Sequence, residues 1–228
     1  LAALYHHYGE EKARKVVGDI VASLKPVVVN GHLAMAQILL AGGDFQPGRA
    51  EYEWRNMTEA GKLTMPAMTS AHWNGMRIPE GRLLLVGDQG YGDTIQFARY
   101  IQMAAERVQD VILGCSAEME PLLAKLPGVA RYCHRWDDVP GHAVHCRLSS
   151  LPYIFGTTPD TIPAQVPYLS ADPARVAYWK QRLDHTLPAG VKRIGLAWTG
   201  RPTHPNDRRR SIRLSRLLPL ADAGRASF

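Results

Sequence analysis

The chain has 228 residues, of which 46% are hydrophobic, so it can bury a sizeable core and is not disordered throughout. Its net charge of +6 and pI of about 9.3 would by themselves fit a nucleic-acid-binding protein. However, eight basic residues and one acid fall between Lys192 and Arg216, so the excess charge belongs to one segment. Such a cluster suits a phosphorylated small molecule better than a duplex backbone, and we expect no nucleic-acid partner. The alternative is a solvated arginine run.

The sequence contains no apolar run as long as a membrane span and no visible signal peptide, so no transmembrane segment is expected. The three cysteines are odd in number and not closely paired, which favours free thiols in a reducing, cytoplasmic compartment. Because the chain begins with Leu1 rather than Met and ends abruptly at Phe228, we expect it to be a fragment of a longer protein.

One short region is rich in possible zinc ligands: Cys133, His134, His142, His145 and Cys146. It lacks the Cys-x-x-Cys and His-x-x-x-His spacings that zinc sites commonly use. The favoured interpretation places the thiols on buried strands and the histidines in the intervening loop. No metal is therefore expected.

Residues 1–57 are predicted to be a helical segment. A first helix would cover residues 1–24, with an apolar face made of Val16, Val17, Ile20, Val21 and Leu24. A second helix over 32–41 would end at Gly42-Gly43, and a third would begin near Pro47. The last two resemble the helix–turn–helix of a tetratricopeptide repeat. Since one such unit cannot bury its own face, we expect it to pack on the next domain through Tyr52 and Trp54.

Residues 58–80 are predicted to be an extended linker on the surface, because they hold Met65-Pro66, Asn74-Gly75 and Pro79. The following run, Leu83–Val86, is apolar without alternation, as in a strand buried on both faces. Glycines come next, and then apolar residues recur at helical spacing. We therefore predict a central parallel strand, a glycine-rich turn and a helix with Asp93 in its first turn.

Strand and helix patterns then alternate through residues 81–171, which predicts a parallel sheet with helices on both faces. The expected strands are 111–115, 129–133 and 142–146, the expected helices are 117–125 and 148–155, and the expected crossing segment is 157–167. Residues 172–228 would hold a helix from Asp172 to about Leu187 and a buried strand over 192–198. That strand would begin a second half that remains incomplete.

The glycine-rich turn differs from the better-known phosphate loops. A Walker loop ends in Gly-Lys-Ser/Thr, whereas Asp93 and Thr94 follow Gly92 here. The dinucleotide fingerprint is Gly-x-Gly-x-x-Gly, whereas the order here is Gly-x-x-Gly-x-Gly. An acid at the helix start repels phosphate but can accept a proton. Asp93 could equally be a structural residue of the first helical turn.

The stretch Gly87–Tyr100 reads Gly-Asp-Gln-Gly-Tyr-Gly-Asp-Thr-Ile-Gln-Phe-Ala-Arg-Tyr. It resembles the first strand–loop–helix of bacterial glycosyltransferases akin to the family 9 heptosyltransferases, especially the branch in which this domain follows tetratricopeptide repeats. Later segments resemble the same branch: 148–157, Ile162-Pro163, 167–169, 194–200, Asn206-Asp207 and Arg210-Ser211.

The resemblance implies an α/β chain in which a Rossmann-like N-terminal half of a GT-B fold follows a tetratricopeptide-like helical segment, with the second half truncated. It implies inverting transfer from a nucleotide-sugar donor, which is a substrate, without any cofactor. Asp93 would be the catalytic base, and Gly90, Tyr91 and Gly92 would form the acceptor-side loop. The donor diphosphate would meet Thr199, Gly200, Arg201, Asn206, Arg208, Arg210 and Ser211. Gln89 and Tyr91 differ from the heptosyltransferase loop, so a heptose donor does not follow.

Two other functions remain open. One is an interaction adaptor, in which tetratricopeptide-type helices bind a protein partner and the α/β part is a non-catalytic platform. The other is a nucleotide-binding module without catalysis. Donor binding and release of sugar from a nucleotide sugar distinguish these from a transferase, whose acceptor would be a protein or a glycan. Without a complete second half, the fragment is expected to be inactive alone, with an unsupported tail over 192–220.

Overall fold

A computed structural model describes most of the chain: residues 9–23, 29–58, 61–62, 64–65, 68–88, 90–200, 207–222 and 226–227. It divides into two compact units, Leu1–Ser170 and Ala171–Phe228, which we call unit 1 and unit 2. Among the described residues, no helix is both long enough and apolar enough to cross a bilayer.

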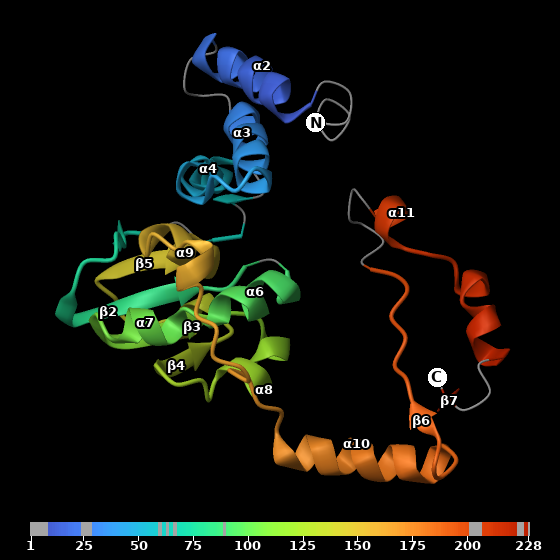
Figure 1. The fold of residues 1–228 in the computed structure, drawn as a ribbon. Coiled ribbons are helices and arrows are strands. Elements are labelled where there is room, and N and C mark those ends of the chain that lie inside the picture. Colours follow the sequence, from blue (N-terminus) through green and yellow to red (C-terminus); the bar gives the residue numbers. More distant parts are fainter. Residues whose placement is uncertain are drawn as a thin grey trace. The chain divides into compact units, whose positions relative to one another are not determined.

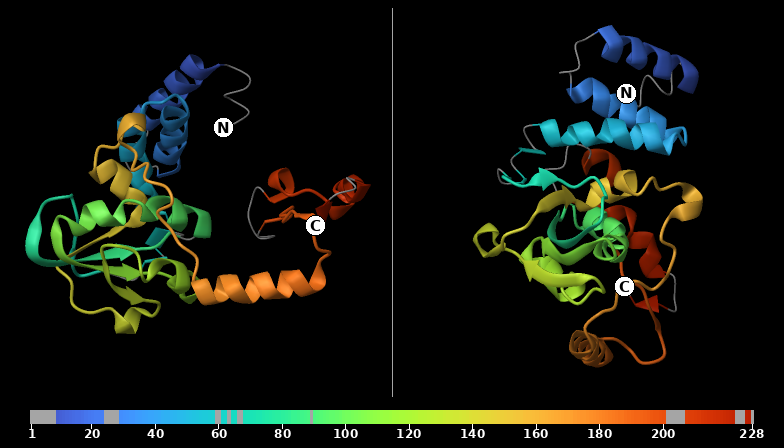
Figure 2. Two further views of the ribbon diagram at one scale, coloured as in Figure 1. Left: turned by 60° about the horizontal axis from the view of Figure 1, so that its bottom comes forward. Right: turned by 90° about the vertical axis from the view of Figure 1, so that its left-hand side faces the viewer.

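Unit 1 begins with three helices that lie beside one another, coloured blue to cyan (Figures 1 and 2). These are α2 (Glu10–Ser23), α3 (Val29–Ala41) and α4 (Phe45–Tyr52), and the short 3-10 helix η1 (Glu53–Met57) follows. The predicted third helix is therefore confirmed, and the second begins earlier than expected. Residues 1–8 and 24 of the predicted first helix lie outside the described residues.

The buried face of α2 differs from the predicted one. Ala13 and Val17 are buried against Ala34 and Ile38 of α3, whereas Val16 is 39% exposed. The side chains of Ile20 and Val21 are outside the described set. The prediction was wrong at Val16 because it counted only the larger apolar residues. The small residue Ala13 belongs to the buried face instead.

Trp54 packs within the helical segment rather than on the next domain, whereas Tyr52 borders a cavity that residues of the α/β part also line. Trp54 stacks on His32 of α3, with ring centroids 3.8 Å apart, and His32 Nδ1 is 2.6 Å from a carboxylate oxygen of Glu51. Tyr52 is 38% exposed, and its ring lies under the guanidinium of Arg55. Polar contacts instead join the helices to the sheet: Arg49 donates to the carbonyl oxygens of Pro152 and Thr157.

A five-stranded parallel sheet forms the body of unit 1, with strand order β1-β5-β2-β3-β4 (Figure 1). The strands are β1 (Ala71–His72), β2 (Ile78–Val86), β3 (Val108–Gly114), β4 (Val129–Cys133) and β5 (Val144–Arg147). The α-helices between and after them are α6 (Tyr91–Ala98), α7 (Ile101–Ala105), α8 (Glu120–Leu123) and α9 (Leu151–Ile154). The short 3-10 helices are η2 (Ala117–Met119), η3 (Trp136–Asp138), η4 (Leu148–Ser150) and η5 (Pro159–Thr161). The predicted central strand is confirmed, since Leu83–Val86 pair with β3 on one side and β5 on the other.

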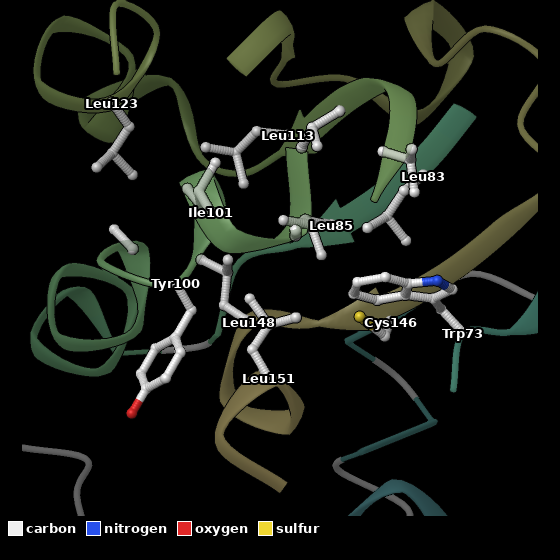
Figure 3. Close-up of a cluster of buried hydrophobic side chains, with 14 of the residues drawn as sticks. Trp73, Leu83, Leu85, Tyr100, Ile101, Leu113, Leu123, Cys146, Leu148 and Leu151 are labelled. Carbon is white, nitrogen blue, oxygen red and sulfur yellow. The ribbon is translucent and has the colours of Figure 1, made fainter. Parts of the chain in front are cut away.

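The two faces of the sheet are covered differently. Leu83, Leu85 and Leu113 face a large cluster to which the helices α6, α7 and α8 contribute, including Ile101 and Leu123 (Figure 3). The opposite face carries Leu84, Val86, Ile112 and Cys133, packed by Met65, Met68 and Val139. Those three packing residues lie outside helices, so the predicted helical layer is not seen among the described residues that pack on this face.

The segment predicted as a surface linker enters the core. Its β1 strand pairs in parallel with β5, and Trp73 directly after it is fully buried next to Leu83 and Cys146 (Figure 3). The Trp73 ring meets Phe155 edge to face at 5.9 Å, and its Nε1–H donates to the carbonyl of Met76 at 2.9 Å. The prediction failed because the partner of this segment lies about seventy residues further along the chain.

Unit 2 begins with the exposed helix α10 (Pro173–Thr186). Asp172 caps its N-terminus, because the Asp172 side chain accepts hydrogen bonds from the backbone N–H groups of Ala174 and Arg175. The strand predicted over 192–198 is only β6 (Lys192–Arg193), and both of its residues are exposed. It pairs in parallel with β7 (Ala226–Ser227), so the expected buried strand is wrong in length and in burial. Three short helical elements lie between them: α11 (Asp207–Arg210), η6 (Leu214–Arg216) and η7 (Leu218–Asp222).

Candidate functional site

The strand order places a topological switch point between β2 and β5. From β2 the chain proceeds through β3 to β4, and then returns to put β5 on the other side of β2. In open parallel sheets, ligands bind outside the carboxyl ends of the strands at such a point. In unit 1, Asp88 follows the end of β2 and Ser149 follows the end of β5, so these two side chains lie on either side of it.

Two cavities open at these carboxyl ends. The larger has a volume of about 320 Å³ and is lined by Thr64, Val86, Gly87, Asp88, Tyr91, Gly114, Cys115, Ser116, Cys133, His134, Arg135 and Trp136. The smaller has a volume of about 220 Å³ and is lined by Tyr52, Arg55, Thr58, Gly61, Thr64, Asp88, Asp93 and Arg147. Asp88 and Thr64 belong to both linings, so the two cavities adjoin.

The turn after β2 brings its predicted residues together at the start of α6. Asp93 lies in the first turn of this helix, as predicted, and its exposed side chain lines the smaller cavity. A Cβ added at Gly90 would lie 2.7 Å from Asp93 Oδ2, so a larger residue there would displace the Asp93 carboxylate from its place beside the turn. Tyr91 is 55% exposed and lines the larger cavity. A Cβ at Gly92 would meet nothing within 4 Å, so this position is open.

Asp88 is held by the segment that follows β5. Its Oδ2 accepts from the backbone N–H of Ser149 at 3.0 Å, and its Oδ1 accepts from the Ser149 hydroxyl at 2.5 Å. Burial raises the pKa of the Asp88 carboxyl above its ordinary value, while the Ser149 hydrogen bonds and the charge of Arg55 oppose that rise. This carboxylate therefore sits rigidly at the junction of the two cavities.

Arg55 joins the helical segment to the same place. Its Nη2 donates to the hydroxyls of Ser149 and Ser150, each at 2.8 Å, and its Nη1 lies 2.7 Å from Glu53 Oε1. Ser150 in turn donates to Glu53 Oε2 at 2.8 Å. The Arg55 Nε is buried and has no hydrogen-bond partner among the described residues. Thus η1 supplies a wall of the smaller cavity and supports the serine that holds Asp88.

Arg147, the last residue of β5, is 5% exposed. Its Nε donates to Asn56 Oδ1 at 2.8 Å, and its Nη2 donates to the carbonyl of Gly61 at 2.7 Å and to the Thr64 hydroxyl at 2.9 Å. Burial lowers the pKa of the Arg147 guanidinium, and the nearby Asp88 carboxylate opposes that change. These bonds fix the residues between the helices and β1 against the end of the sheet.

The buried position of Asp88 predicts a dependence of stability on pH. Because its folded-state pKa is raised, the contribution of this group is complete below pH 3.8 and is lost as the pH rises through the folded-state pKa. Asp88→Asn removes this titration, so the stability of the variant relative to the natural protein should increase from about pH 4 to 7. Urea unfolding at several pH values measures the difference. Ser149→Ala should steepen the natural trend, because it removes a bond that lowers the Asp88 pKa. A difference that stays constant with pH contradicts the prediction.

Four of the predicted donor-phosphate residues come together in unit 2. The Ser211 hydroxyl accepts from the backbone N–H of Gly200 at 3.1 Å and from the Thr199 hydroxyl at 3.4 Å, and it donates to Asp207 at 2.7 Å. Arg210 lies 3.8 Å from Asp207 and packs on Gly200, where an added Cβ would be 2.7 Å from Nη2. Arg208 lies beside them on α11 and is exposed. Arg201 and Asn206 lie outside the described residues.

The sheet keeps Cys133 and Cys146 apart, so these two thiols cannot belong to one zinc site. Cys146 belongs to the cluster on one face, with Leu83 and Leu85, and Cys133 belongs to the cluster on the other, with Leu84 and Val86. Their strands are separated by β2 and β3. At about 4.8 Å per strand the two thiols are too far apart to share an ion with bonds of about 2.3 Å. No group of three possible metal ligands occurs among the described residues.

Sequence reasoning did not find Asp88, Arg147 and Ser149 as site residues. Their signal was their position, since each lies at or just after the carboxyl end of an apolar strand, where parallel sheets bind ligands. Arg55 carried no such signal, because η1 reaches the site only through tertiary packing.

Comparisons with known proteins give a distant relative. No family model matches the chain, and no solved structure matches it. The chain is 28% identical over 190 residues to Protein FlbA of Caulobacter vibrioides. This match covers 72% of the chain and 30% of FlbA, so the chain spans less than a third of that protein's length.

Proposed function

We propose that unit 1 is the acceptor-side half of an inverting glycosyltransferase of the GT-B type, and that Asp93 is its general base. The observation that carries this proposal is the position of the Asp93 carboxylate. It lines a cavity at the carboxyl ends of parallel strands, in the first turn of the helix after the central strand. A general base must be within reach of a bound hydroxyl and able to take its proton.

The capping interpretation of Asp93 receives less support. Asp172 is the N-cap of α10 and accepts from two backbone N–H groups, whereas the N-cap of α6 is Gly90 and Asp93 lies three residues further on, where it lines a cavity. The Asp93 carboxylate is exposed and lines the cavity, so it can accept a proton from a ligand that binds there.

We further propose that the helices α3 and α4 are a tetratricopeptide-like repeat, that unit 2 begins the donor half, and that the donor is a cytoplasmic nucleotide sugar. No metal takes part in this proposal, because arginines supply the positive charge for the departing diphosphate.

The direct test is a panel of nucleotide sugars incubated with the full-length protein, with release of nucleoside diphosphate as the readout. We expect release above a no-protein control for at least one donor. If no donor is consumed and none raises the unfolding temperature, the proposal is wrong and the adaptor function is favoured. If a donor raises the unfolding temperature without losing its sugar, the chain is a nucleotide-binding module.

The arginines of α11 provide a second test. Replacing Arg208 and Arg210 with Gln should weaken binding of the donor by ~10-fold or more, since hydrogen bonds to charged groups contribute about 1.5–3 kcal/mol. The variant should also show a flatter dependence on salt. Calorimetry at low and high salt measures both effects. Arg175 and Arg182 on α10, changed to Gln together, are the matched control for lost charge. Equal affinity of the Arg208/Arg210 variant and this control would make α11 a solvated surface.

A further inference from the structure

We infer that the larger cavity binds a neutral carbohydrate ring between the side chains of Tyr91 and Trp136. This inference rests on the proposed function. The larger cavity adjoins, through Asp88 and Thr64, the smaller cavity that Asp93 lines, so the ring would be the part of the acceptor that binds beside the reacting hydroxyl. The inference is carried by the aromatic residues of the cavity, the glycines beside it and its charge.

Tyr91 and Trp136 come from the ends of strands on either side of β3. Tyr91 is the first residue of α6, which follows β2, and Trp136 is the first residue of η3, which follows β4. The strand order β2-β3-β4 places the end of β3 between them. Both side chains border the same cavity of about 320 Å³.

Two glycines at the strand ends lie beside the cavity and carry no side chain that could fill it. A Cβ at Gly114, the last residue of β3, would lie 3.4 Å from Trp136 Cζ3, so the indole covers that backbone closely. A Cβ at Gly87 would lie 2.5 Å from Cys115 Sγ, which a side chain could not tolerate. The two glycines therefore allow Trp136 and Cys115 to pack closely against the strand ends beside the cavity.

The two aromatic side chains are left open to ligands. Trp136 is 44% exposed and Tyr91 is 55% exposed, although the sheet beside them is buried. Both line the same cavity. The face of an aromatic ring carries negative potential, which attracts the slightly positive C–H groups on the face of a sugar ring. Exposed aromatics that converge on a cavity with a few polar groups are typical of a small-molecule site.

The remaining lining residues favour a neutral sugar over a nucleotide. Asp88, Ser116 and Thr64 offer hydrogen-bonding groups to hydroxyls. Among the described lining residues, Arg135 is the one arginine and lysine does not occur, while His134 lies 3.5 Å from Glu120. A diphosphate is usually bound by several cations, so this cavity suits an uncharged polyol better.

Saturation-transfer difference NMR on the chain tests the inference with methyl glycosides of glucose, galactose, mannose and N-acetylglucosamine, and with uridine monophosphate. At least one glycoside should receive saturation from the natural chain. Its apparent Kd should weaken by ~5-fold or more in Trp136→Ala and in Tyr91→Ala, because each variant removes one contacting ring. Trp179→Ala is the matched control: Trp179 lies on α10 and is 54% exposed, so its loss should not change binding.

Three results overturn the inference. These are no saturation of any glycoside, equal binding by both cavity variants and the natural chain, and loss of uridine monophosphate binding rather than glycoside binding in the variants. The last result would make the site a nucleobase site. Unfolding curves that match the natural chain show that each variant folds. Because Tyr91 and Trp136 lie on different elements, one variant can still test the inference if the other fails to fold. Should glycoside binding fail while Asp93-dependent turnover persists, the inference alone is wrong and the proposed function stands.

Discussion

Replacing Asp93 with Asn is expected to reduce glycosyl transfer by the full-length protein by ~10²-fold or more, while leaving its unfolding temperature unchanged. The amide has nearly the shape of the carboxylate but cannot take a proton from the acceptor hydroxyl. Since the Asp93 side chain is exposed, folding should not depend on its charge. Release of nucleoside diphosphate and thermal unfolding measure the two effects separately.

Asp160→Asn is the matched control for the Asp93 experiment. Asp160 is an exposed acid in the first turn of η5, and it lines neither cavity. This variant should retain full activity. If Asp93→Asn retains activity but unfolds at a lower temperature, Asp93 is a structural residue of α6, and the general base must be sought elsewhere.

Trp73→Ala should lower the unfolding free energy of unit 1 by about 3–5 kcal/mol, the usual cost of truncating a buried large aromatic residue. The indole is fully buried in the main core cluster, meets Phe155 edge to face and donates a hydrogen bond to Met76. Its loss leaves a cavity next to β5 and an unpaired carbonyl. Urea unfolding followed by circular dichroism measures the change.

Trp179→Ala provides the comparison for that experiment, since it removes the same side chain from an exposed position on α10. It should change the unfolding free energy by less than about 0.5 kcal/mol. If both variants lose the same small amount, the segment after β1 does not belong to the core, and the original prediction of a surface linker would be correct.

The strand–turn–helix unit around β2 could be predicted because its signals are local. Leu83–Val86 lack alternation since they are buried on both faces, and this run is the central strand. Asp93 follows at a fixed spacing, so its place in the first turn of α6 was also predictable. The burial of Trp73 was not, because Asn74-Gly75 and Pro79 give turn signals whatever the chain packs against.

The network around Asp88 depends on distant pairing, and for that reason no local pattern contains it. Ser149 reaches Asp88 only because β5 lies beside β2, and Arg55 reaches Ser149 only because η1 lies against the same edge. In unit 2 the local sequence pattern led to a wrong prediction of a buried strand. Lys192–Trp198 has the pattern of a buried strand, but the two-residue partner β7 pairs with only its first two residues.

The position of β5 also determines when this unit can finish folding during synthesis. β5 is the last strand of unit 1 to leave the ribosome, yet it lies between β1 and β2. A nascent chain that ends before Val144 can pair β2, β3 and β4, but it holds β1 without a neighbour and Trp73 without its cover. Pairing between strands so far apart in the sequence is slow, and until β5 pairs, the apolar surface of the incomplete sheet remains exposed to other chains. The emergence of a single four-residue strand therefore completes the core and, through Arg147 and the serines behind it, assembles the pocket in the same event.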